Sequence, residues 1–250
     1  MPADKTRPVL VFLHGAGVDH ELWAPQVEAF SKDYHLIVPD LPGHGTVPVV
    51  DSVEEMAEHV RTQIHRSGLQ EYSVIGLSMG GMVALEMAQR WPDEVTHLAM
   101  IESVPNVTQN PFLRALIGVI VGLLRIISPK LLASMPARSM GAETAEAGAY
   151  VKRAIRQMQA ENVYRVMKAA LAYDGRAGMA KLDLPTLIMV GEKNKATHKR
   201  AKAMAEEITN SRFVMIPKAG HIANRDGASF VNSELAKLFE SKHLTKSTSS

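Results

Sequence analysis

Cysteine is missing from all 250 residues of this chain. Without thiols the protein can form no disulfide, cannot use a cysteine nucleophile and cannot bind a metal through cysteine. Neither sign of charge is in large excess, since 28 Lys and Arg residues against 26 Asp and Glu residues leave a net charge of +2. So small a charge does not indicate a nucleic-acid partner, and the basic residues between 193 and 202 are interpreted as the solvated start of a helix.

No apolar stretch meets the requirements of a membrane span. The strongest one, residues 112–127, contains Arg114 and Arg125 and is shorter than the ~20 residues that a span needs. We interpret it as a buried or pocket-lining helix, with a helix lying at a membrane interface as the alternative. The first residues, MPADKTRPVL, contain no apolar signal core, so the expected location is cytoplasmic.

The sequence does contain an alternation of short apolar runs and helical patterns, which is typical of a mostly parallel α/β sheet flanked by helices. The run Val9–Leu13 is apolar without interruption, as expected for a strand covered on both faces. Further strands are predicted at residues 36–38, 72–76, 95–101, 186–190 and 212–216. Helices are predicted at residues 53–64, where Ser52 and Glu55 have capping-box spacing, and at 79–90, 196–208 and 228–239.

The alternation is interrupted once, between residues 105 and 181, where at least two helical stretches occur and no strand is predicted. This pattern predicts a core made of residues 1–104 and 182–250, with a helical cap of residues 105–181 inserted after the strand that ends near Ile101. Methionines in the cap would suit an adaptable substrate pocket, and ordinary core filling explains them equally well. They are Met135, Met140, Met158, Met167 and Met179.

The segment Gly76-Leu77-Ser78-Met79-Gly80 matches the pattern G-x-S-x-G. A strand pattern precedes it and a helical pattern with small residues follows it. A nucleophile elbow needs this setting, because the serine sits in a strained turn and glycines let strand and helix approach closely. Ser78 is therefore the candidate nucleophile.

His14-Gly15 comes directly after the first predicted strand. There the chain must turn sharply and can aim a backbone N–H at a developing oxyanion. The N–H groups of Ala16 and Met79 are the candidate oxyanion hole, and His14 is interpreted as a structural turn residue.

His221 follows the last predicted strand, in Ala219-Gly220-His221, and precedes the last helix. The chain order Ser78 then His221 is the order that a serine nucleophile and its base require on this kind of sheet. His221 is the candidate general base, and a surface loop residue is the other interpretation.

The motifs LHGAG (13–17), DLPGHG (40–45), GLSMGG (76–81) and AGH (219–221) together resemble the α/β-hydrolase superfamily, and most closely its small serine esterase and enol-lactonase-like members. The resemblance covers residues 9–239 and is weakest across the cap. It implies the α/β-hydrolase fold and a catalytic triad that needs neither a metal nor an organic cofactor.

The triad acid departs from the family pattern. The resemblance implies an aspartate after the penultimate strand, and Asn194 occupies that position. One hypothesis moves the acid to Glu102, which follows the apolar run ending at Ile101, where burying a charge without a partner would be costly. In the second hypothesis Asn194 marks a weakened or non-hydrolytic site, and Glu102 only caps or salt-bridges locally. Glu192 is the third candidate.

The expected function is hydrolysis of a carboxylic ester or lactone of a hydrophobic small molecule through Ser78, His221 and Glu102 and an acyl-enzyme. A carbon–carbon bond hydrolase or a thioesterase would use the same triad. A ligand-binding protein that retains the fold without turnover is the alternative of another class. The expected partner is the small-molecule substrate, and the sequence does not determine the oligomeric state.

Overall fold

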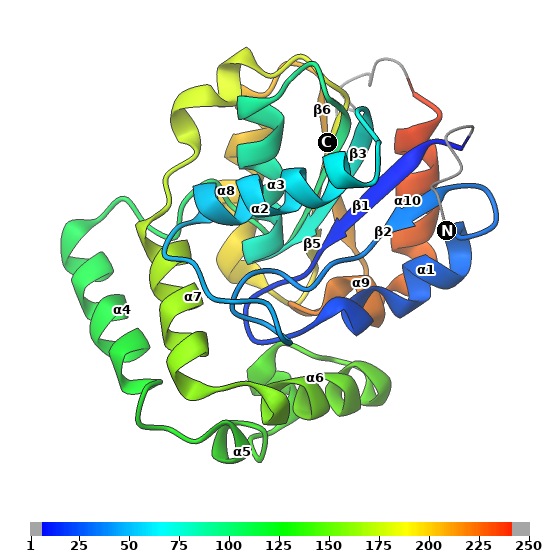
Figure 1. Ribbon diagram of the computed structural model, residues 1–250. Helices are drawn as coiled ribbons and strands as arrows, with labels where there is room; N and C mark the ends of the chain where they lie inside the picture. The colour runs from blue at the N-terminus through cyan, green and yellow to red at the C-terminus, as the bar shows by residue number, and fades with distance from the viewer. Residues whose placement is uncertain (1–6, 242–250) are drawn as a thin grey trace.

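A computed structural model describes residues 7–241, and Figure 1 shows them as a twisted sheet with helices on both faces. Six strands form one sheet in the order β2-β1-β3-β4-β5-β6, and every neighbouring pair is parallel. The strands are β1 (Val9–Leu13), β2 (His35–Ile37), β3 (Tyr72–Leu77), β4 (Val95–Ile101), β5 (Thr186–Gly191) and β6 (Ser211–Ile216). The predicted parallel α/β fold is confirmed. Residues 1–6, part of the stretch on which the expected location rests, lie outside the described residues.

The strands are apolar on both sides because helices cover both faces of the sheet. In β1 every residue is buried: Val9, Val11 and Leu13 face one core and Leu10 and Phe12 face the other. The first core packs against α2 (Val53–Arg66), α3 (Met79–Arg90) and α8 (Lys195–Glu207). The second core packs against η1 (His20–Trp23), α1 (Ala24–Phe30), α9 (Ala223–Asp226) and α10 (Ala228–Phe239).

Local signals set the helix boundaries. Ser52 caps α2 by accepting a hydrogen bond from Glu55 N at 3.1 Å, as its spacing predicts. Glu55 bonds back to the N–H of Asp51 at 2.9 Å, one residue earlier than in a standard capping box. The short helices η1 and α1 were not predicted, although Pro25 in the first turn of α1 is a signal of a helix start.

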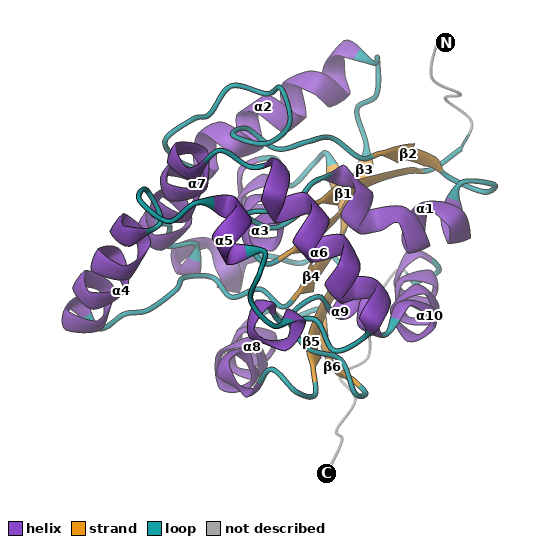
Figure 2. Ribbon diagram, turned by 90° about the horizontal axis from the view of Figure 1, so that it is seen from below, coloured by secondary structure: helices purple, strands orange, loops and turns teal. Residues whose placement is uncertain are grey.

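Residues 105–181, between β4 and β5, are helical, as the sequence predicts. They form α4 (Pro111–Leu123), α5 (Pro129–Leu132), η2 (Ala137–Met140), α6 (Ala145–Gln157), α7 (Ala160–Ala172) and η3 (Arg176–Lys181). Their strand-like feature is an isolated bridge between Asn106 and Asp174. Figure 2, seen from below, shows α5 and α6 in front of the strands.

This helical segment packs against both faces of the sheet. Val166 and Ala169 of α7 join the core that contains α2 and α3, whereas Tyr150 and Val151 of α6 join the core that contains α10. The segment is therefore fixed to the sheet at two places, one on each side.

One expectation about this segment is wrong. Residues 112–127 were interpreted as a buried or pocket-lining helix, yet Val121 is the buried residue of α4, and Phe112 is 87% exposed. A helix that is apolar all round looks buried in the sequence, and the sequence does not reveal that one face lacks a partner. Within residues 7–241, no helix has the length and apolarity that crossing a membrane would require.

Candidate active site

The sheet topology brings the candidate residues to one edge. The turn 14–17 follows β1, Ser78 follows β3, Glu102 follows β4 and His221 follows β6. All strands are parallel, so these positions all lie at or beyond the carboxyl edge of the sheet, where ligands bind in open α/β folds.

Ser78 occupies a strained turn between β3 and α3. Its backbone has φ +56° and ψ −118°, a conformation that non-glycine residues rarely adopt. Two bonds hold it there: Ser78 N donates to the carbonyl of Ile101 at 2.9 Å, and Ser103 Oγ donates to the carbonyl of Ser78 at 2.7 Å. The strain places the serine at the tip of an elbow, as the G-x-S-x-G pattern predicts.

Glycines let the elbow close. A Cβ atom at Gly76 would lie 2.1 Å from the carbonyl oxygen of Gly80, and a Cβ atom at Gly80 would lie 2.1 Å from the carbonyl oxygen of Leu13. Neither backbone oxygen can move aside without displacing a strand or a helix. The glycines are thus required by the close approach of α3 to β1 and β3.

We predict that Gly80→Ala destabilises the protein by about 3 kcal/mol, the upper part of the usual cost of overpacking. The control is Gly122→Ala, because a Cβ at Gly122 would meet no atom within 4 Å. Gly122 lies in α4, so its replacement by alanine should be neutral or slightly stabilising. Urea unfolding midpoints measure both changes, and equal midpoints for the two variants would contradict the packing argument.

The turn after β1 lies against the elbow, since a Cβ at Gly15 would be 3.3 Å from Ser78 Cβ. Two histidines brace this turn. His14 Nε2 accepts a hydrogen bond from Leu41 N at 2.9 Å, and His44 Nε2 accepts one from Gly17 N at 3.1 Å. His14 therefore has the buried, hydrogen-bonded surroundings of a structural turn residue, as predicted.

The backbone N–H groups of the two candidate oxyanion-hole residues are available. Among the hydrogen bonds of residues 7–241, none is donated by the N–H of Ala16 or of Met79. Met79 is the first residue of α3, where the helix itself leaves N–H groups unsatisfied. Both groups can thus donate to a ligand oxygen.

Burial makes the turn sensitive to acid. Burial, and then the neighbouring His44, lower the pKa of His14 from 6.5 to about 3. The unfolded chain therefore binds a proton that the folded protein excludes, so stability falls as pH drops below 6.5. We predict a contribution of about 1.4 kcal/mol per pH unit between about pH 6 and 4 from this one histidine.

Urea unfolding at several pH values in this window tests the prediction, and His14→Gln should remove that part of the slope. His20→Gln is the comparison, because its hydrogen bond with Asp40 raises the pKa of His20. The contribution of His20 to the free energy of unfolding is therefore fully present below pH 6.5 and is lost as pH rises through the raised pKa, opposite to that of His14. A slope between pH 6 and 4 that is the same in wild type and His14→Gln would refute the role of His14.

The loop that carries His221 is bound to the helical segment. Ile222 N donates to the carbonyl of Gly141 at 2.9 Å, and a Cβ at Gly141 would lie 2.4 Å from His221 Cβ. Asp226 bridges the two parts, because its carboxylate accepts from Gly220 N and from Glu143 N, each at 3.0 Å. The contacts with Gly141 and Glu143 link residues far apart in the chain, and no local pattern marks them.

Glu102 is the carboxylate that the fold places beside His221. Its Oε2 lies 3.5 Å from His221 Nδ1, and its side chain is fully buried while that of His221 is 34% exposed. The residue has φ +51°, a second strained position at this edge of the sheet. Glu192, the other candidate acid, is exposed and accepts a hydrogen bond from Lys218 N at 2.7 Å.

Three donors hold the Glu102 carboxylate. Gly191 N donates to Oε1, while Asn194 Nδ2 at 2.5 Å and Thr197 Oγ1 at 3.0 Å donate to Oε2. Such a set satisfies an ionised carboxylate away from water. Thr197 was not recognised from the sequence, because a threonine in the first turn of a helix carries no signal for this contact.

Asn194 lies between Glu102 and His221. Its Nδ2 is 3.2 Å from His221 Nδ1, so the amide can donate to an unprotonated Nδ1, whereas Glu102 can accept from a protonated one. Only the second tautomer leaves Nε2 free to take a proton from a serine.

The Ser78 hydroxyl and the His221 ring share no hydrogen bond within residues 7–241. Catalytic hydrogen bonds are often formed only once substrate is bound.

A second serine–histidine pair occurs at the opposite edge of the sheet. Ser73 Oγ lies 3.0 Å from His97 Nδ1, and both residues line a cavity of about 750 Å³. His97 Nε2 lies 3.1 Å from the carbonyl of Ser241, which fixes Nε2 as the donor. Within residues 7–241 no carboxylate is hydrogen-bonded to this ring, and burial lowers the pKa of His97. The pair lacks the orienting acid of a triad.

Metal ligands are not grouped at this edge. Among residues 7–241, no cluster of three or more His, Asp or Glu side chains is arranged to hold a metal ion.

The sequence is similar to those of known hydrolases. A 2-(N-methylformamido)methylenesuccinate hydrolase from Acinetobacter baylyi is 36% identical over 98 residues, which are 38% of this chain and 37% of that protein. A pimeloyl-[acyl-carrier protein] methyl ester esterase from Neisseria meningitidis is 25% identical over 84% of this chain and 69% of its own length. The chain thus spans about a third of the first relative and about two thirds of the second.

Two solved structures have the same fold. The enol-lactonase from Burkholderia xenovorans has a TM-score of 0.84 at 22% identity, covering 96% of this chain and 94% of its own. A thermophilic esterase from Thermogutta terrifontis has a TM-score of 0.85 at 25% identity, covering 95% and 90%. Residues 10–233 match the sequence model described as the alpha/beta hydrolase family. The expected superfamily is therefore confirmed, and the chain belongs to the alpha/beta hydrolase family.

Proposed function

We propose that the protein is a serine hydrolase that cleaves a carboxylic ester or lactone of a hydrophobic small molecule. The observation that carries the proposal is the buried Glu102 carboxylate, held by three donors and 3.5 Å from His221 Nδ1. A buried carboxylate with this many partners, beside a histidine whose side chain is 34% exposed, is the arrangement that orients a general base.

In the proposed reaction Ser78 Oγ attacks the acyl carbon while His221 Nε2 accepts the hydroxyl proton. Glu102 holds the Nδ1–H tautomer and offsets the charge of the imidazolium. The N–H groups of Ala16 and Met79 stabilise the tetrahedral oxyanion. His221 then protonates the leaving alcohol, and a water molecule, deprotonated by the same histidine, hydrolyses the acyl-enzyme and restores the Ser78 hydroxyl.

We propose that residues 105–181 form a cap over this edge of the sheet. Its attachment beside the catalytic loop, through Gly141 and Asp226, supports this assignment. The names of relatives and fold neighbours, a methyl ester esterase and an enol-lactonase, support ester or lactone bonds as the class of substrate. Cleavage of a carbon–carbon bond or a thioester bond would need the same catalytic residues. Compounds with these bonds are the other substrates to test.

A second candidate function rests on one observation. The amide of Asn194 contacts both Glu102 and His221 Nδ1, and the tautomer that it favours cannot accept the proton of a serine. In a ligand-binding protein without turnover His221 does not act as a base, so this tautomer would be no disadvantage.

Hydrolysis of p-nitrophenyl acetate, butyrate and octanoate and of dihydrocoumarin separates the two functions, with Ser78→Ala as the blank. We expect turnover well above the blank on an ester or on the lactone, with the longer chains preferred. If none of these four substrates is turned over faster than by Ser78→Ala, the proposal of an ester or lactone hydrolase fails and the binding function is favoured.

A further inference from the structure

Large apolar side chains are exposed almost exclusively on one part of the molecule. Nine of the ten exposed large hydrophobic residues within 7–241 come from residues 112–135, and the tenth is Met215 of β6. We call these nine the apolar patch. They are Phe112, Leu113, Leu116, Val119, Ile120, Leu123, Ile126, Leu131 and Met135. A concentration of this kind on a folded protein indicates an interaction surface.

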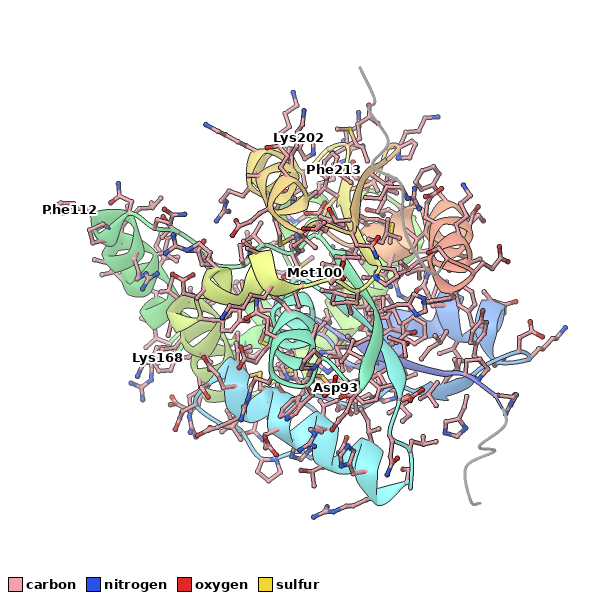
Figure 3. All side chains as sticks on the ribbon, turned by 90° about the horizontal axis from the view of Figure 1, so that it is seen from above. Asp93, Met100, Phe112, Lys168, Lys202 and Phe213 are labelled. Atoms are coloured by element: carbon pink, nitrogen blue, oxygen red, sulfur yellow. The ribbon has the colours of Figure 1, made fainter. Side chains whose placement is uncertain are left out.

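Six of the nine patch residues lie on α4. Phe112, Leu116, Ile120 and Leu123 recur at helical spacing and are 87%, 58%, 55% and 48% exposed. Val121, on the opposite side of the helix, is buried. Figure 1 places α7 between α4 and the sheet, and Figure 3 shows Phe112 directed away from the body of the protein. The outer face of α4 therefore has no partner within the described chain.

The charged residues of the chain segment that contains the patch are all basic. From Ser103 to Ala142 the sequence contains four basic residues, Arg114, Arg125, Lys130 and Arg138, and neither Asp nor Glu. Arg125 and Arg138 are 54% and 81% exposed, although each also has an acidic neighbour, Glu161 or Glu143. Apolar side chains beside cations on one helical surface are complementary to a lipid layer, which has an apolar acyl interior and can have anionic headgroups.

A second copy of the chain fits this face less well. Symmetric pairing of two α4 helices would bring the cations of both copies together, and like charges across an interface disfavour association. We propose that α4 and the residues that follow it, up to Met135, bind an anionic lipid surface. The apolar patch would lie at the level of the headgroups and upper acyl chains, and the nearby cations would contact lipid phosphates.

Vesicle co-sedimentation of the full-length chain tests this proposal. We expect binding to phosphatidylcholine vesicles that contain phosphatidylglycerol to be at least about tenfold tighter than to pure phosphatidylcholine, and to weaken as salt is raised. Phe112→Asp combined with Ile120→Asp should lower the affinity at least about tenfold, and Lys130→Glu should reduce the preference for the anionic vesicles. Met215→Asp is the matched control, because Met215 is exposed outside the patch and should leave binding unchanged.

Two results would overturn the proposal. One is failure of the wild type to bind the anionic vesicles. The other is a dimer in light scattering that Phe112→Asp dissociates, with no vesicle binding, which would assign the patch to a second copy. The readout is binding, so it is independent of whether the protein hydrolyses an ester. A thermal unfolding scan of each variant confirms that the fold is retained.

Discussion

Glu102→Gln is expected to lower kcat for ester hydrolysis by about 10⁴, because a neutral amide cannot offset the positive charge that His221 acquires. In serine proteases the equivalent change from aspartate to asparagine has an effect of about this size. The substitution has a second cost, since the donors from Gly191, Asn194 and Thr197 now face a side chain with one oxygen in place of two. The measurement is kcat and KM with p-nitrophenyl butyrate, normalised to folded protein.

Glu192→Gln is the matched control for this experiment. Glu192 is also a glutamate at the end of a strand, but its carboxylate is exposed and bonds to Lys218 N. We expect its kcat to stay within about twofold of wild type, as for a surface substitution without a buried partner. If Glu192→Gln loses activity and Glu102→Gln keeps it, the assignment of the acid is wrong.

Adding Asn194→Asp to Glu102→Gln is expected to raise kcat at least about 10²-fold over that of Glu102→Gln alone. Asn194 Nδ2 is 3.2 Å from His221 Nδ1, so an aspartate there would present a carboxylate at hydrogen-bond distance from the ring. It would occupy the position at which the family resemblance places the acid. The measurement is kcat of the double variant against Glu102→Gln alone.

Asn194→Asp by itself is expected to impair the enzyme. Its carboxylate would stand where an amide now lies 2.5 Å from Glu102 Oε2, and two carboxylates so close cannot both be ionised near neutral pH. A double variant no more active than Glu102→Gln would contradict the idea that either position can supply the acid.

The fold could be predicted from the sequence because its signals are local. Buried parallel strands have largely apolar sequences, and the strands predicted at Val9–Leu13 and Val95–Ile101 coincide with β1 and β4. The elbow at Ser78 could be predicted for the same reason, since the strained turn needs glycines within a few residues of the serine.

The rest depends on contacts between distant residues. The choice between Glu102 and Glu192 follows from which side chain the sheet buries beside His221, and residue type alone does not decide it. The contact of Asp226 with Glu143 joins distant parts of the chain in the same way. The exposed face of α4 was missed because an apolar pattern reports hydrophobicity and does not report whether a partner covers it.

Covalent labelling with a fluorophosphonate tests the proposed nucleophile most directly, because the probe forms a stable adduct only with an activated serine. The proposed triad predicts one adduct per chain, on the peptide that contains Ser78, with no adduct in Ser78→Ala and labelling slowed by about 10³ or more in His221→Ala. An unlabelled wild type, or an adduct at another serine such as Ser73, would contradict it.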